Sequence, residues 1–323
     1  MNQTLIHRKL LRRVRSFPAE VAARIINIPL FANKLSSSYE REISRHKPRL
    51  PKLSETDAEI VAGLEQDGVY MTSLEALALP DTDQMLSSAL KLMEAYAGRS
   101  AKGEFRSQYT IQASAAEVMR HPQIFWWGLN QRLLRIVEAY LGLPVGYDGM
   151  NFFYTVADGR QVGARLWHRD LEDRRIVKVT VYLHDVGEDG GPYEILHRDF
   201  PGSRSLSGFN YPVLTQEKLE QKVSAPISDQ DVTSCVGPAG TVIFSDSATR
   251  YHRGKPAVSR DRCAIFYNYF SRVPLRPFFC ERSGLSRAQI ASLAADLSPD
   301  QRACTLWRDD LPWIAKIIPP APL

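Results

Sequence analysis

The stretch that decides the fold is VKVTVYL, residues 177–183, in which two kinds of side chain alternate strictly. The odd-numbered positions hold three valines and a leucine, whereas the even-numbered positions hold Lys178, Thr180 and Tyr182. Successive side chains of a β-strand point to opposite faces, so one face of this segment is apolar and the other is partly polar. The pattern predicts a strand with one face packed on a core.

Similar short runs fill the chain from residue 145 onward, separated by turn sequences such as EDGG (188–191) and GPAG (237–240). These runs are GMNFFYTVA (149–157), GARLWHRD (163–170), GPYEILH (191–197), GTVIFSDSA (240–248) and DRCAIFYNYFSR (261–272). Helical spacing of apolar residues marks segments 57–68, 81–98, 125–144 and 285–298. We therefore expect a mainly β core of about residues 145–273, an antiparallel barrel or jelly roll, flanked by N- and C-terminal helices.

Positive charge is concentrated at the N-terminus. Residues 1–50 hold eleven Lys and Arg against three Asp and Glu, while the other 273 residues hold 30 against 33. Ile6, Leu10 and Val14 share one helical face, and basic residues crowd the opposite one. Such a helix suits an anionic membrane surface or an acidic partner, although it could also pack on the core through its apolar stripe. We expect residues 1–50 to be a basic arm and linker, and 51–323 to be the main domain.

Other bulk features limit the functional classes. No apolar stretch is long enough to cross a bilayer, and the N-terminus lacks the pattern of a standard secretion signal. The four cysteines are widely spaced, which favours scattered buried thiols over a zinc site or disulfides. We therefore expect the protein in a reducing cytoplasm, with peripheral membrane contact through the basic arm. The aromatic residues near the arm have helical core spacing, so we expect no nucleic-acid partner. The oligomeric state is left open.

The tripeptide HRD occurs twice, and a histidine and an aspartate two residues apart on a strand can reach one metal ion. His168 and Asp170 end one β-run, and another begins at residue 175. His197 and Asp199 are followed instead by FPGSRSLSGFNYP (200–212), which reads as a loop. We therefore expect the first copy to carry the ligands.

A third ligand is expected at the end of a later strand, and His252 follows the run GTVIFSD (240–246). Two imidazoles and one carboxylate on one face of Fe(II) leave three positions open for a cosubstrate and dioxygen. A keto-acid cosubstrate needs a fixed cation for its distal carboxylate, which the planar fork of arginine can bind through two hydrogen bonds. Arg262 opens a β-run and is favoured over Arg260, which lies in a turn, although both remain candidates.

These segments together resemble the phytanoyl-CoA dioxygenase family of Fe(II)- and 2-oxoglutarate-dependent oxygenases. The residues that carry the resemblance are WHRD (167–170), VKVTVYLHDVGEDGGPYEIL (177–196) and the run from Gly237 to Phe270. The resemblance extends loosely from about residue 57 to 273. It implies a double-stranded β-helix core, an iron triad at His168, Asp170 and His252, and 2-oxoglutarate binding by Arg262.

The function that this resemblance implies is oxidation, most simply hydroxylation, of an unactivated C–H bond of a small-molecule or lipid-like substrate. Fe(II) is then the metal cofactor, 2-oxoglutarate and O2 are cosubstrates, and succinate and CO2 are released. Lys178, Thr180 and Tyr154 are candidate cosubstrate contacts at the barrel mouth, or else ordinary solvent-facing strand positions. No residue selects the substrate.

Two alternatives come from other classes. HRD also occurs in the catalytic loop of protein kinases, but neither copy is followed by the required asparagine, and the other kinase motifs are absent. The second alternative is a non-catalytic β-helix protein that binds a ligand or partner, with a membrane surface among the candidate partners.

Overall fold

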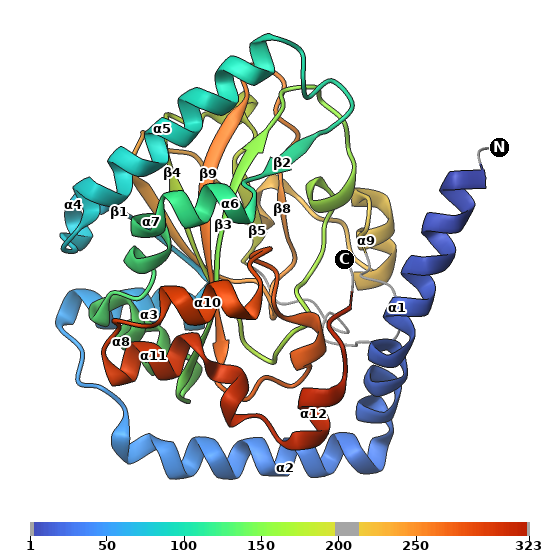
Figure 1. Cartoon of the computed structure of the whole chain (residues 1–323), viewed down its shortest axis with the longest axis vertical. Coiled ribbons are helices and arrows are strands. Elements are labelled where there is room, and N and C mark those ends of the chain that lie inside the picture. The colour runs from blue at the N-terminus through green and yellow to red at the C-terminus, as the bar shows by residue number, and fades with distance from the viewer. Residues whose placement is uncertain (1–2, 198–212, 322–323) are drawn as a thin grey trace.

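The computed structural model describes residues 3–197 and 213–321, with only the helical backbone described for residues 3–14. Its core is two antiparallel sheets (Figure 1). The six-stranded sheet has the order β1 (Val69–Ser73), β7 (Thr241–Asp246), β4 (Val177–Tyr182), β9 (Arg262–Ser271), β3 (Val145–Thr155) and β2 (Thr110–Gln112). The three-stranded sheet has the order β6 (Val232–Cys235), β5 (Tyr193–Leu196) and β8 (His252–Gly254).

The chain passes back and forth between these sheets. From β4 in the large sheet it enters β5 and β6 in the small one, returns to β7, crosses to β8 and ends in β9. Alternation between two facing antiparallel sheets is the winding of a jelly roll, or double-stranded β-helix. The predicted fold class is therefore confirmed.

The alternation in β4 is also confirmed, and it shows which face is which. Val177, Val179 and Val181 lie in the main hydrophobic cluster, which joins the large sheet to the helices. Tyr182 lies in a second cluster, with residues of both sheets such as Tyr193 and Ile243. The even-numbered residues of β4 thus face the space between the two sheets, which we call the barrel interior.

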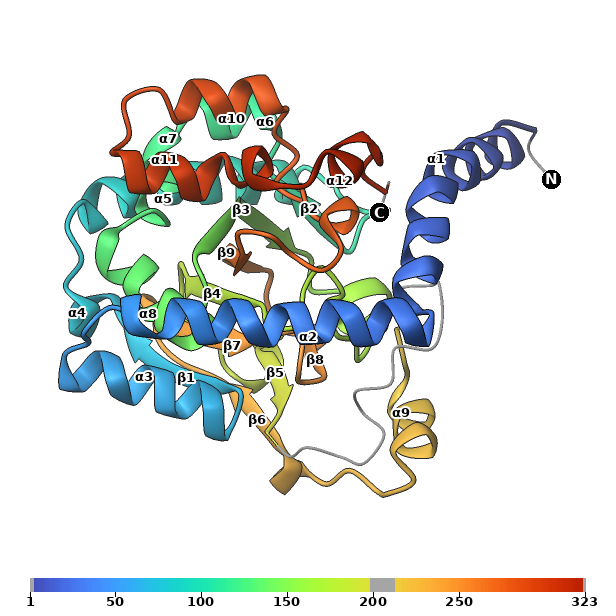
Figure 2. The ribbon, with the colours of Figure 1, turned by 90° about the horizontal axis from the view of Figure 1, so that it is seen from below.

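Helices cover the outer face of the large sheet, and Figure 2 shows those formed by residues 82–101, 122–127, 287–293 and 299–305 on the side away from β5 and β6. Between residue 51 and β3 the helices are α3 (Glu55–Gln66), α4 (Leu74–Leu77), α5 (Thr82–Ala101), α6 (Ala115–Arg120), α7 (Pro122–Trp127) and α8 (Gln131–Leu141). The later helices are α9 (Gln216–Val223), α10 (Arg287–Leu293), α11 (Pro299–Thr305) and α12 (Trp313–Ile317).

The expectation of one helix over residues 125–144 is wrong, because the segment is broken between α7 and α8. Asn130 begins the second helix by accepting a hydrogen bond from the Arg132 backbone N–H at 2.9 Å. A Cβ atom at Gly128 would lie 2.5 Å from the Tyr147 hydroxyl and from Tyr267, so the break lets these tyrosines of the sheet approach the backbone.

The N-terminal segment is helical and lies mostly outside the core. It consists of α1 (Gln3–Asn27) and α2 (Pro29–His46), which meet at a bend beside Ile28 (Figure 2). Helix α2 contains no buried residue, whereas Ala19 and Ala23 of α1 pack against Phe278. Among the described residues, no helix is both long and apolar enough to cross a bilayer.

Candidate metal centre

Three side chains predicted as metal ligands meet at one point in the structure. His168, Asp170 and His252 are all buried, and each offers a ligand atom within 4.8 Å of the others. The two histidines pair across an isolated antiparallel bridge, in which the His168 N–H donates to the His252 carbonyl at 3.0 Å and the reverse bond is 2.9 Å. Their ring centroids are 4.3 Å apart. Backbone pairing thus brings together residues far apart in the sequence.

The local structure around His168 differs from the expected strand over 163–170. Residues Gly163–Arg165 form a 3-10 turn, and only single bridges follow, from Trp167 to Leu214 and from His168 to His252. The backbone of Asp170 is fixed by one hydrogen bond, in which its N–H donates to the Ser247 carbonyl at 2.9 Å. The segment is therefore fixed by isolated bonds rather than by a continuous ladder.

The hydrogen bonds of both imidazoles orient them for metal binding. His168 Nδ1 lies 2.8 Å from the Leu166 carbonyl oxygen, and His252 Nδ1 lies 3.3 Å from that of Arg250. A carbonyl oxygen only accepts, so each Nδ1 carries the proton and Nε2 keeps its lone pair. Burial lowers the pKa of His168 and, more strongly, that of His252, which favours the neutral form that binds a metal.

The charges around Asp170 favour its ionised form. Burial alone would raise its pKa, but Lys178, and then His252 and His168, outweigh burial and hold the pKa well below the usual range. The Lys178 ammonium forms an ion pair with this carboxylate from the barrel interior. His252 Nε2 lies 3.8 Å from Asp170 Oδ2 and has no hydrogen-bond partner within the described parts of the chain. A buried nitrogen acceptor facing a carboxylate fits a divalent metal ion, and this donor set is that of non-haem Fe(II) sites.

The structure separates the two candidate arginines. Arg262 is buried at the start of β9 and donates to the Gly191 carbonyl, whereas Arg260 is exposed. A Cβ atom at Gly254 would lie 3.0 Å from Arg262 Nη2, so the guanidinium lies against the β8 backbone two residues beyond His252. A strand rises about 3.3 Å per residue, which puts the Gly254 backbone roughly 6–7 Å from that of His252. Arg262 forms no ion pair with a carboxylate of the described chain.

Further polar groups line the barrel interior between the triad and Arg262. Thr180 is fully buried, and its hydroxyl has no partner among the described residues. Tyr193 stacks on the His252 ring with centroids 5.5 Å apart and an angle of 24°. We did not predict Tyr193 from the sequence, although its place in the run GPYEIL, on the same strand face as Ile195, was a usable signal.

Tyr154 lies elsewhere. Its ring packs in the main cluster beside Tyr96 and Phe105, on the face of β3 that meets the helices, and its hydroxyl donates to Asp261 at 2.7 Å. The expected place at the barrel mouth is therefore wrong. The reason is the register of β3, in which even-numbered residues such as Phe152 and Tyr154 face outward.

Among the described residues, neither His197 nor the pair His184 and Asp185 belongs to the group of three potential metal ligands. His197 lies 3.4 Å from the Thr233 hydroxyl, and Asp199 is outside the described residues. His184 Nε2 accepts a hydrogen bond from the Cys263 N–H at 2.9 Å, which is a structural role. The four cysteines are free and buried, as predicted.

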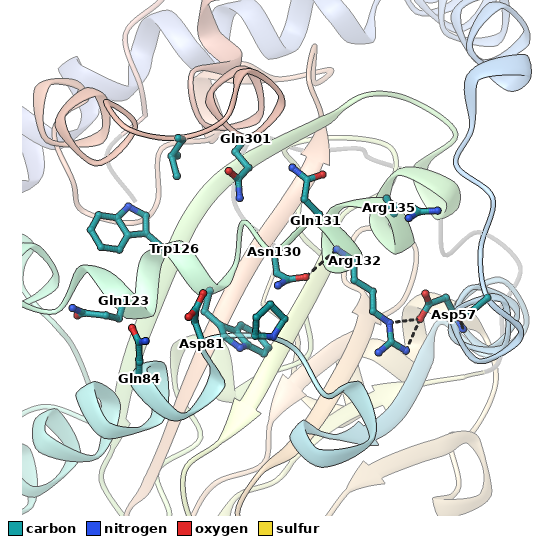
Figure 3. Close-up of a pocket in the computed structure, with 14 residues that line it drawn as sticks. Asp57, Asp81, Gln84, Gln123, Trp126, Asn130, Gln131, Arg132, Arg135 and Gln301 are labelled. Carbon is teal, nitrogen blue, oxygen red and sulfur yellow. Dashed lines mark hydrogen bonds and ion pairs between the residues drawn. The ribbon is translucent and has the colours of Figure 1, made fainter.

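A separate pocket of about 1150 Å³ lies at the junction of α5, α7 and α8 and contains none of the triad residues (Figure 3). Five carboxamide side chains and Trp126 line it, and an ion pair between Arg132 and Asp57 closes one end. The carboxamides belong to Gln84, Gln123, Asn130, Gln131 and Gln301. The group of three potential metal ligands found among the described residues lies outside this pocket, so the metal centre remains the candidate active site.

Comparison with known proteins gave structural similarity only. No family model and no curated protein sequence matches the chain. Among solved structures, EctD from S. alaskensis with 2-oxoglutarate and 5-hydroxyectoine is 20% identical, with a TM-score of 0.47, over 74% of this chain and 89% of that one. The epimerase SnoN with Fe3+, alpha ketoglutarate and nogalamycin RO is 14% identical, with a TM-score of 0.45, over 76% and 91%. HygX from Streptomyces hygroscopicus with nickel and 2-oxoglutarate is 13% identical, with a TM-score of 0.43, over 68% and 88%.

Proposed function

We propose that this protein is a non-haem Fe(II)- and 2-oxoglutarate-dependent oxygenase. The observation that carries the proposal is the buried group of His168, Asp170 and His252 with the Arg262 guanidinium beside the same strand as His252. The triad supplies the ligand set, and Arg262 supplies a fixed cation at a distance suited to a short dicarboxylate. The resemblance of the sequence motifs points to the same chemistry.

Each group has a definite role in this proposal. His168 and His252 bind iron through Nε2, because their Nδ1 protons are held by backbone carbonyls. Asp170 supplies the third ligand and a negative charge. Arg262 holds the distal carboxylate of 2-oxoglutarate through its fork, and the buried Thr180 hydroxyl is placed to donate to the same ligand.

The chemistry that bound Fe(II), 2-oxoglutarate and O2 supply is oxidation of a substrate C–H bond, coupled to conversion of the keto acid into succinate and CO2. Tyr182, Tyr193 and Ile195 line the barrel interior as buried side chains, and we expect them to shield the reacting atoms from bulk water. The substrate proposed is a small or lipid-like molecule, with hydroxylation the simplest outcome. No observed contact selects its identity.

The test uses the two HRD copies as a matched pair. Wild-type protein with Fe(II) and 2-oxoglutarate in air should release CO2 and succinate slowly even without substrate. His168→Ala should abolish this release and stoichiometric Fe(II) binding, whereas His197→Ala should change neither. If the wild type binds iron and 2-oxoglutarate but releases no succinate with any candidate substrate, a non-catalytic binding protein is the better description. Equal release by wild type and His168→Ala would refute the metal assignment.

A further inference from the structure

Helix α1 carries two apolar stripes on opposite faces. Ala19, Ala22, Ala23 and Ile26, spaced as one helical face, pack in a cluster with Phe278. Phe17, Val21 and Ile25, spaced four residues apart, define a second face of the same helix, and Ile28 follows at the bend. Of these, Phe17, Ile25 and Ile28 are exposed, and Phe17 keeps 63% of its surface accessible. One stripe therefore holds α1 on the protein while the other has no apolar cover among the described residues.

Helix α2 repeats this arrangement directly after the bend. Tyr39 and Ile43 are partly buried, and Ile43 lies close to Gly142 on the body of the protein. Leu30, Phe31 and Leu35 are exposed, with 76% of Leu30 accessible. On a helical wheel Leu30 and Phe31 lie at least about 120° from Ile43, whereas Leu35 lies about 80° from it. Exposed apolar side chains thus follow those of α1 on the other side of the bend.

The C-terminal helix α12 adds three more exposed apolar side chains, Trp313, Ile314 and Ile317. It lies near the bend, because Ile318 and Ala321 join the cluster formed by α1 and Phe278. Nine of the seventeen large hydrophobic side chains that are exposed in the described chain lie in Phe17–Leu35 and Trp313–Ile317. We call these nine residues the outer apolar face. Exposed apolar surface gathered in this way marks an interaction site.

Charge decides between possible occupants of this face. The sequence continues the outward spacing of α1 toward the N-terminus at Val14, Leu10 and Ile6, and residues 1–50 hold eleven basic against three acidic side chains. A second copy of the chain would bring an equally basic segment against this one, which like-charge repulsion opposes. An anionic lipid surface is complementary to it, and Trp313 is a residue type enriched at the membrane interface. Because no described helix can span a bilayer, the contact would be interfacial.

We propose that the outer apolar face of α1, α2 and α12 binds the protein to the surface of an anionic membrane, with its apolar side chains inserted among the lipid headgroups and the basic N-terminal residues against acidic phosphates. This inference does not depend on the metal centre. It assigns a function to the N-terminal fifty residues, which the oxygenase chemistry does not use.

The experiment is flotation of the full-length protein with vesicles. The probes are phosphatidylcholine vesicles and vesicles in which a third of the lipid is phosphatidylglycerol. Wild-type protein should float with the anionic vesicles, and added salt should release it in part, because screening weakens the electrostatic contribution. Ile25→Ser with Ile28→Ser should weaken the partitioning at least about tenfold, because both side chains would otherwise leave water. The circular dichroism spectrum should not change.

A matched control replaces exposed valines elsewhere on the surface, Val236→Ser with Val258→Ser, and should leave partitioning unchanged. Replacing Arg8, Lys9, Arg12 and Arg13 by Gln should remove the preference for anionic over neutral vesicles. Wild-type protein that fails to float with anionic vesicles would overturn the proposal. A second result would also overturn it: a wild-type dimer that becomes a monomer in the Ile25→Ser, Ile28→Ser variant while vesicle binding persists. The outer apolar face would then bind a second copy of the chain.

Discussion

The role of Arg262 gives the sharpest prediction, tested by Arg262→Lys. The change keeps the positive charge but replaces a fork that makes two parallel hydrogen bonds by a single ammonium. Losing one charge-assisted hydrogen bond to a carboxylate costs roughly 1.5–3 kcal/mol, which corresponds to about a 10- to 100-fold rise in the Kd for 2-oxoglutarate. Arg260→Lys, at the exposed neighbouring position, should change the Kd less than about twofold.

The assay is anaerobic titration of Fe(II)-loaded protein with 2-oxoglutarate, followed by the visible charge-transfer absorption of the complex. Arg262 also donates to the Gly191 carbonyl, so a loss of affinity could come from disturbed structure. A keto acid of the same length without the distal carboxylate, 2-oxovalerate, separates the two causes. Its weak binding should be the same in wild type and Arg262→Lys, as expected when the lost contact is to that carboxylate. An unchanged Kd for 2-oxoglutarate in Arg262→Lys, or a large rise in Arg260→Lys, would refute the assignment.

Three further predictions concern the surroundings of the site. Gly254→Ala should raise the Kd for 2-oxoglutarate several-fold and leave iron binding unchanged, because the added methyl would lie 3.0 Å from Arg262 Nη2. An unaltered Kd would mean that the guanidinium is not held against β8. Tyr140→Phe should lower the free energy of unfolding, measured in urea, by about 1–3 kcal/mol, because the buried Asp246 carboxylate loses the hydroxyl that donates to it at 2.6 Å. An unchanged free energy of unfolding would show that water replaces the lost hydroxyl. Phe152→Ala should cost about 3–5 kcal/mol in the same assay, because Phe152 is fully buried between the large sheet and α5, and a cost below 1 kcal/mol would contradict the described packing.

Much of the barrel could be predicted because its strands alternate in the sequence. In β4 the letters alone indicated two distinct faces, and the structure places the valines toward the helices and the even-numbered residues toward the interior. Tyr154 shows the limit of this reasoning. The run 149–157 holds apolar residues at nearly every position, so alternation could not tell which face would meet the helices.

The candidate ligands could be chosen from context, but their geometry could not be derived. His168 and His252 are brought together by a single antiparallel bridge, which depends on how two segments distant in sequence align in three dimensions. The ion pair of Lys178 with Asp170 likewise follows from the direction of β4 relative to a loop, which no periodicity encodes. In α1 only the stripe of Ile6, Leu10 and Val14 was identified from the sequence, and the alanines that pack on Phe278 became apparent in the structure.

The iron assignment is tested by anomalous diffraction at the iron absorption edge, from crystals grown anaerobically with Fe(II) and 2-oxoglutarate. We predict one strong peak per chain, within coordination distance of His168 Nε2, His252 Nε2 and an Asp170 carboxylate oxygen, with the far end of 2-oxoglutarate on Arg262. A fully loaded crystal with no iron between these three side chains, or with iron bound elsewhere, would contradict it.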